Sequence, residues 1–187
     1  AAAAATPRLR TPARTWRWLE QPDPAIQALV DEVSWTTIQA RIMKLTRFRT
    51  RSAGTTYNEA AAETLRAFFQ RLGLLSEFHS FTHYGRTYRN VVATQLGNAH
   101  PESIIVALAH FDCLSEDPHY NAPGADDNAS GVAAIQIAAE ILAKVECDYT
   151  VKYLCTNCEE IGLVGSQAWA QWARDSNLAI VGSLSYD

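Results

Sequence analysis

The chain has 187 residues, enough for one α/β domain with a full core, and 48% of them are hydrophobic, as in ordinary globular domains. The formal net charge of −4 argues against a nucleic-acid partner, because nucleic-acid-binding proteins usually present a basic surface. No hydrophobic run approaches the roughly 18 residues that a membrane span requires.

The first 23 residues differ from the rest of the chain. Five alanines open this segment, and three prolines and four arginines interrupt the part that follows. That composition does not suit an amphipathic core helix, and the hydrophobic stretch is too short for a signal peptide. We therefore expect residues 1–23 to form an irregular N-terminal segment or a linker, and residues 24–187 to form the folded domain.

Helices and a hairpin are predicted next along the chain. Hydrophobic residues recur at helical spacing over Ala25–Val33, and Ser34 is placed to cap a second helix. Asn58 is predicted to cap a third helix, which should stop at Gly73. Residues 75–97 then show the pattern of a β-hairpin that turns near Tyr84-Gly85.

The second half of the sequence alternates hydrophobic strands with helices. Strands are predicted over Ser103–Ala109, Tyr149–Asn157 and Leu178–Tyr186, with a helix over Asn128–Lys144 and another after residue 166. This order predicts an α/β fold, a three-layer sandwich with a mixed, mostly parallel central sheet flanked by helices.

Possible metal ligands follow all three of these strands. His110 and Asp112 follow the first, Glu159 and Glu160 the second, and Asp187 the third. Because the carboxyl ends of parallel strands form the ligand crevice of an open sheet, these side chains should gather at one edge. One acidic residue after a strand is common in loops, but the coincidence over three strands predicts a metal site.

An aspartate pair, Asp126 and Asp127, precedes the predicted helix 128–144. The dipole and the free N–H groups of a helix N-terminus favour a carboxylate and keep it ionised, as a metal ligand must be. Taken alone, the pair is more simply interpreted as helix capping.

Three ordered motifs carry a resemblance to a known family. They are His110-Phe-Asp112, Ala122-Pro-Gly-Ala-Asp-Asp-Asn-Ala-Ser-Gly131 and Cys158-Glu-Glu-Ile-Gly-Leu-Val-Gly-Ser166. Together they resemble the di-zinc exopeptidases that include bacterial leucyl aminopeptidase, in a wider group with glutamate carboxypeptidases and glutaminyl cyclases. The resemblance implies a phosphorylase/hydrolase-like catalytic domain over residues 24–187.

The same resemblance implies a role for each candidate residue. Two zinc ions would be the cofactors, and peptides with a free N-terminus the substrates. The implied metal ligands are His110 and Asp187 on one zinc, Glu160 on the other and Asp127 as the bridge. The implied catalytic residues are Glu159 as the general base and Asp112, which would hold the His110 ring. Geometry also favours the last role, because residues two apart on a strand share a face.

Four ligands fall short of what two such ions need. By the usual rule of about three protein ligands for a catalytic zinc, two ions sharing one bridge require roughly five. The family supplies another histidine further along its chains, so we expect this sequence to be part of a longer protein whose sheet is incomplete at the C-terminus. All four remaining histidines, His79, His83, His100 and His119, are more simply interpreted as solvated surface residues, and His119 is the least unlikely substitute ligand among them.

The sequence therefore predicts a zinc-dependent aminopeptidase. A one-zinc glutaminyl cyclase and a non-catalytic module of the same fold are the alternatives, and the adjacent Glu159-Glu160 pair favours the peptidase. A secreted or periplasmic location is expected in preference to a cytoplasmic one, since such enzymes are often exported. Cys155 and Cys158 are interpreted as small buried hydrophobic residues. Substrate side-chain preference and oligomeric state stay open.

Overall fold

The described part of the chain begins at Asp23, whose side chain caps the first helix. The computed structural model describes residues 23–187. The prediction of an irregular segment or linker over residues 1–23 therefore lies almost wholly outside the described residues. Within residues 23–187, no helix is both long and hydrophobic enough to cross a membrane.

Three helices open the described chain: α1 (Pro24–Val30), α2 (Trp35–Thr46) and α3 (Thr56–Arg71). Ser34 caps α2 as predicted, because its hydroxyl oxygen accepts the backbone N–H of Thr37. The prediction that Asn58 caps α3 is wrong. Thr55 takes that role, and the Asn58 side chain is instead buried, where it hydrogen-bonds to other segments.

The predicted hairpin is confirmed as β1 (Leu75–His83) and β2 (Arg86–Gln95). Tyr84 and Gly85 connect the two strands with φ angles of 45° and 76°. Two consecutive positive φ angles are typical of the tight turns that match the twist of hairpin strands, which explains the glycine.

The second half alternates as predicted. It consists of β3 (His100–His110), the wide turn η1 (Ala125–Ala129), α4 (Ser130–Leu142), β4 (Tyr149–Thr156), α5 (Val164–Asp175) and β5 (Ala179–Ser185). The helix expected from residue 128 begins slightly later, because η1 precedes it.

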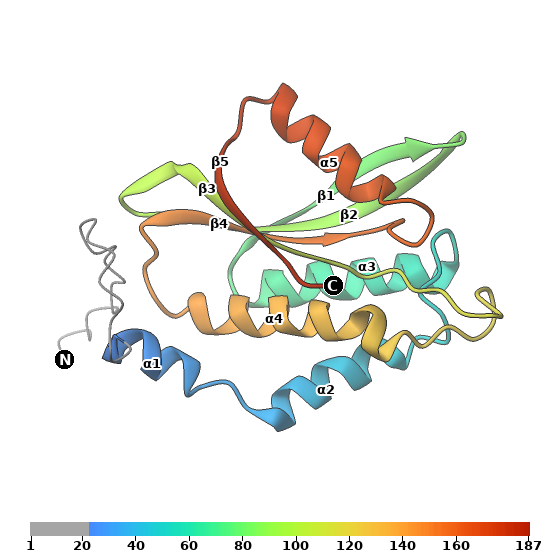
Figure 1. The fold of residues 1–187 in the computed structure, drawn as a ribbon, viewed down its shortest axis with the longest axis horizontal. Coiled ribbons are helices and arrows are strands. Elements are labelled where there is room, and N and C mark those ends of the chain that lie inside the picture. Colours follow the sequence, from blue (N-terminus) through green and yellow to red (C-terminus); the bar gives the residue numbers. More distant parts are fainter. Residues whose placement is uncertain (1–22) are drawn as a thin grey trace.

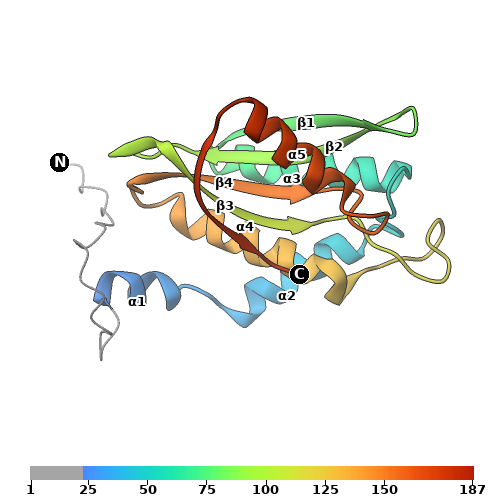
Figure 2. The same cartoon turned by 45° about the horizontal axis from the view of Figure 1, so that its top comes forward.

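The five strands form one mixed sheet in the order β1-β2-β4-β3-β5 (Figure 2). β3 pairs in parallel with β4 and β5, whereas β2 is antiparallel to β1 and β4. Because β2 alone runs against its neighbours, the other four strands share one direction. The predicted mixed, mostly parallel sheet is therefore confirmed.

Helices cover both faces of the sheet (Figure 1). α3 and α4 lie on one face, with α2 packed on α4, and α5 lies on the other, so the expected three layers are present. The main core lies between the sheet and α3 and α4 and includes Leu65, Phe69, Val132, Ile135 and Tyr153. Hydrophobic side chains packed from two sides of a sheet stabilise this kind of layered fold.

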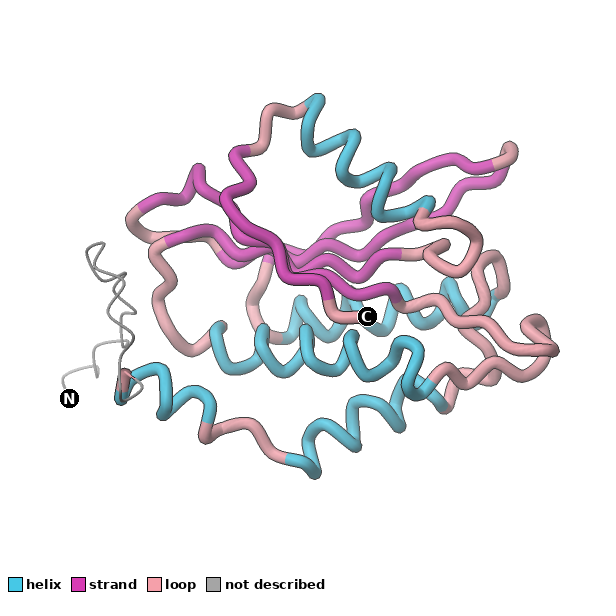
Figure 3. The backbone as a smooth tube through the Cα atoms, in the orientation of Figure 1, coloured by secondary structure: helices cyan, strands magenta, loops and turns pink. Residues whose placement is uncertain are grey.

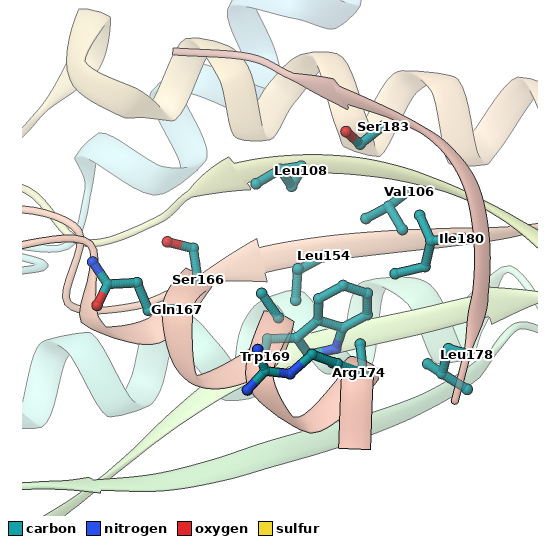
Figure 4. Close-up of a pocket in the computed structure, with 12 residues that line it drawn as sticks. Val106, Leu108, Leu154, Ser166, Gln167, Trp169, Arg174, Leu178, Ile180 and Ser183 are labelled. Atoms are coloured by element: carbon teal, nitrogen blue, oxygen red, sulfur yellow. The ribbon is translucent and has the colours of Figure 1, made fainter. Parts of the chain in front are cut away.

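A smaller core lies under α5, where Trp169 packs against Val106 and Leu154. Beside it is a mostly hydrophobic pocket of about 590 Å³ between α5 and strands β3 and β5 (Figure 4). The pocket is lined by Leu108, Leu178 and Ile180 among others, and no carboxylate or histidine lines it. This pocket therefore lacks the groups that metal chemistry needs.

The loops that matter for function gather at one end of the sheet (Figure 3). The segments after β3 and β4 and the connection from α2 to α3 meet there, and hydrogen bonds link them across long sequence separations. The carboxyl ends of parallel strands thus meet as the sequence predicted.

Candidate metal centre

His110 is the buried centre of the site, at the end of β3, with its side chain 3% exposed. Its Nδ1 atom lies 3.1 Å from the backbone carbonyl oxygen of Asp112, a partner that can only accept. Nδ1 therefore carries a proton, and Nε2 points toward the carboxylates. Asp127 Oδ1 lies 2.9 Å and Asp187 Oδ1 3.2 Å from Nε2. A histidine oriented through its other ring nitrogen is the usual arrangement in metal sites.

Asp127 reaches His110 from η1, and its side chain is 69% exposed. The turn needs Gly124, because φ is +48° there and a Cβ atom would lie 2.5 Å from the Asp127 carbonyl oxygen. Only glycine adopts that backbone without strain and without this clash. The turn therefore presents one carboxylate of the aspartate pair to the histidine.

Asp187 follows β5 and is brought to Asp127 by Asn128. The Asn128 amide nitrogen donates to the carbonyl oxygen of Tyr186 at 2.8 Å, and its amide oxygen accepts the N–H of Gly131 at 2.8 Å. Asn128 is buried, so one amide fastens the start of α4 to the end of β5. Sequence reasoning did not assign a role to Asn128, although it lies within the second motif.

Glu159 and Glu160 occupy the turn after β4, and buried Asp112 holds their backbone. The Asp112 carboxylate accepts the N–H of Glu159 at 3.1 Å through Oδ1 and that of Glu160 at 3.2 Å through Oδ2. Its Oδ1 also lies 3.6 Å from His110 Nδ1, further than its own carbonyl oxygen does. Asp112 therefore orients the histidine mainly through its backbone and the glutamates through its carboxylate.

The charges around His110 shift its titration. Burial by itself lowers the pKa of His110, but the hydrogen bond and charge of Asp112, together with the charges of Glu159 and Asp127, outweigh it and raise the pKa to about 9. Burial, and then the neighbouring carboxylates, raise the pKa of Glu159 and of Glu160, although His110 opposes the shift at both. This concentration of acidic groups favours a bound cation, whose charge would offset their repulsion.

Two groups of side chains in the described chain offer ligand atoms within 4.8 Å of one another. One group is His110, Asp127 and Asp187, and the other is His110, Glu159 and Glu160. Zinc held tetrahedrally at its usual bond lengths separates neighbouring ligand atoms by about 3.4 Å. The distances of 2.9 and 3.2 Å from His110 Nε2 are close to that value, so the residues fit zinc.

All six predicted site residues are thus brought to one end of the sheet, whereas exposed His119 is in neither group. Their individual roles stay predictions. One histidine prediction is wrong: His79 is half-buried, 3.2 Å from the Asn90 amide nitrogen and against the ring of Trp172. Burial lowers the pKa of His79, and its ring lies against the α5 side of the hairpin, 5.5 Å from the ring of Trp172.

A buried arginine connects the backbone segments that carry the site. Arg51 is 0% exposed, and its guanidinium donates to the carbonyl oxygens of Phe111 at 2.8 Å, Pro123 at 2.6 Å and Gly124 at 2.8 Å. It therefore ties the segment after β3 to the segment before η1. These partners lie 60 to 73 positions from Arg51 in the chain, so local sequence patterns did not predict them.

Comparison with known proteins adds the family context. The model of "Peptidase family M28" matches residues 90–187, which include all six predicted site residues. A probable zinc metalloprotease of Pyrenophora tritici-repentis is 30% identical over 190 residues, covering 90% of this chain and 39% of that protein. Another from Leptosphaeria maculans is 32% identical, covering 89% of this chain and 44% of that protein. The chain thus spans less than half the length of these curated relatives.

Solved structures share the fold. The LapA aminopeptidase of Legionella pneumophila superimposes with a TM-score of 0.76 at 20% identity, covering 96% of this chain and 50% of that chain. The glutaminyl cyclase of Porphyromonas gingivalis superimposes with a TM-score of 0.70 at 20% identity, covering 82% and 60% respectively. These TM-scores establish a common fold, whereas sequence identities this low leave the reaction open.

Proposed function

The chain belongs to peptidase family M28, and we propose that it forms the metal-binding part of a zinc-dependent aminopeptidase that removes N-terminal residues from peptides. One observation carries the proposal. The Nε2 atom of buried His110 faces carboxylates from three separate segments, and the ligand atoms lie close enough to share an ion. Imidazole and carboxylate groups are the ligands of hydrolytic zinc sites.

In the proposed site His110 and Asp187 would hold one zinc ion, Glu160 would hold the other, and Asp127 would be a ligand to both. When bound, zinc supplies Lewis acidity that brings the pKa of a water molecule toward roughly 7. Glu159 would act as the general base for the water that attacks the peptide carbonyl, and it would return the proton to the amine as the C–N bond breaks. Both glutamates lie in the turn after β4 and offer ligand atoms close to His110, and the family pattern divides their roles into one metal ligand and one general base.

The zinc content of the full 187-residue chain tests metal binding. We expect wild-type chain to retain zinc after dialysis against limiting free metal, and His110→Ala to lose it. His119→Ala is the matched control, since His119 is exposed and belongs to neither ligand group, and it should retain wild-type zinc content. Equal zinc in all three proteins would overturn the assignment of His110.

The reaction of the chain is tested separately with three peptides. We expect release of the first residue from a peptide with a free N-terminus and no release from its N-acetylated copy. A peptide beginning with glutamine distinguishes the second reaction of this fold. Cyclisation of that glutamine without amino-acid release would replace the aminopeptidase proposal with a glutaminyl cyclase.

A further inference from the structure

Three asparagines outside the ligand set are buried between α3, β2 and the turn after β4. Asn58 and Asn90 are 0% exposed and Asn157 is 1% exposed. A buried amide that lacks hydrogen-bond partners destabilises the folded chain, so each of these side chains needs partners. The three side chains satisfy one another and the surrounding backbone.

Asn58 and Asn157 form a reciprocal amide pair. The Asn157 amide nitrogen donates to Asn58 Oδ1 at 2.9 Å, and the Asn58 amide nitrogen donates to Asn157 Oδ1 at 3.1 Å. Asn157 Oδ1 also accepts the N–H of Cys158 at 2.9 Å. The same side chain therefore joins α3 to the residue that precedes the two glutamates.

Asn90 holds the same turn from β2. Its Oδ1 accepts the backbone N–H of Asn157 at 2.9 Å, and its amide nitrogen donates to the carbonyl oxygen of Gly165 at 2.8 Å. Residues 157 and 165 flank the segment that contains Glu159 and Glu160. One amide thus fastens both ends of that segment to the sheet.

Through Arg51, the hydrogen bonds of the Asn58–Asn157 pair extend to the other side of the site. The Asn58 amide nitrogen also donates to the Arg51 carbonyl oxygen at 2.7 Å. The Arg51 guanidinium binds the carbonyl oxygens of Phe111 and Pro123, in the segments that carry the histidine and the aspartate pair. One continuous buried network therefore reaches each of these three segments without contributing a ligand atom.

From this arrangement we propose that Asn157 is a positioning residue that sets the backbone of the Glu159-Glu160 turn for metal binding and proton transfer. The inference rests on the proposed function above. Asn157 uses its backbone N–H, its amide oxygen and its amide nitrogen together. An alanine keeps only the first of these contacts, so the turn loses its connection to α3. Fully satisfied buried networks of this kind specify one local conformation.

Asn157→Ala in the full chain tests the proposal through zinc affinity, measured by competition with a chromogenic chelator. We expect affinity to fall about 10–100-fold, the range found when groups that orient metal ligands are removed. Where peptide turnover is measured, kcat of Asn157→Ala should fall, relative to wild type, by a larger factor than KM rises. Asn157→Asp keeps the acceptor for Cys158 and should recover part of the lost affinity.

Gln95→Ala is the matched control for a general loss of stability. Gln95 also has an amide contact, partly buried, to the backbone of Leu142, but it pairs with Val151 at the opposite end of β4. We expect both alanine variants to lower Tm of the metal-free chain, and only Asn157→Ala to weaken zinc binding. Equal zinc affinity in both variants would overturn the positioning role.

The test also separates this inference from the proposed function. If wild-type chain binds no zinc, the proposed function fails, whereas the positioning of the turn can still be measured in metal-free protein. There, the backbone amide resonances of Glu159 and Glu160 should shift in Asn157→Ala and stay unchanged in Gln95→Ala. Unchanged resonances in both variants would overturn the inference by itself.

Discussion

The Oδ1 atom of Asp112 accepts the backbone N–H of Glu159 at 3.1 Å, although the two residues lie 47 positions apart in the chain. The other carboxylate oxygen accepts the next N–H along the chain at 3.2 Å. A buried carboxylate that receives two backbone N–H groups holds that backbone firmly. The ends of β3 and β4 are therefore fastened together by an acid that need not contact the metal.

Asp112→Asn should weaken zinc binding about 10–100-fold while the chain stays folded. An amide offers one acceptor oxygen in place of two, so its NH₂ group must face one of the two backbone N–H groups. Competition titration measures the affinity, and circular dichroism checks the fold. Glu116→Gln, an exposed acid in the loop after β3, is the control. An equal affinity in both variants would contradict the role given to Asp112.

Glu159→Gln and Glu160→Gln should separate catalysis from metal binding. Glu159→Gln removes the proposed base, so turnover should fall about 10²–10⁴-fold with zinc content unchanged. Glu160→Gln removes a proposed ligand, so zinc affinity should fall by more than roughly tenfold. Metal analysis and peptide hydrolysis on the same samples measure both effects. The opposite pattern would exchange the two assignments.

Arg51→Met should destabilise the metal-free chain by about 3 kcal/mol or more, measured by urea unfolding. The guanidinium satisfies several buried carbonyl oxygens, and its removal leaves those acceptors unpaired. Arg47→Met changes an exposed arginine at the end of α2 and should stay within about 0.5 kcal/mol of wild type. Similar values for the two variants would show that the buried contacts contribute little.

Gly165→Ala should destabilise the chain by about 1–3 kcal/mol. A Cβ atom at this position would overlap the carbonyl oxygen of Asn157 and lie 2.5 Å from Asn90 Oδ1. Gly182→Ala is a matched change in β5, where an added Cβ atom meets no atom within 4 Å. Thermal unfolding should therefore show a lower Tm for Gly165→Ala only. Tolerance of both changes would contradict the close approach of α5 to the site.

The four cysteine thiols should alkylate slowly in the native chain at pH 8. Burial raises the pKa of Cys155 and of Cys158 to about 12, so little reactive thiolate is present. Half-buried Cys147 should react before buried Cys113, Cys155 and Cys158. Mass spectrometry of timed samples measures the order, and denaturant should expose all four thiols. A disulfide between any two would contradict the free cysteines of the structure.

Local sequence patterns predicted much of the fold because they depend on neighbours in the chain. Helical spacing, the Ser34 cap and the Tyr84-Gly85 turn involve residues a few positions apart, and all three are found in the structure. The failure at Asn58 has a tertiary cause. Its position suits a helix cap, but Thr55 caps the helix and the Asn58 amide bonds to Asn157, 99 positions away.

The sequence by itself determined the residue types of the site and the end of the sheet where they meet, because the carboxyl ends of parallel strands converge. Only the tertiary structure decided how those residues are held. Asp112 holds the backbone of the glutamates through its carboxylate. Arg51 and the three buried asparagines hold the backbone of the loops that carry the site residues through hydrogen bonds. These bonds join segments far apart in the chain, so their partners become evident only after the core has packed.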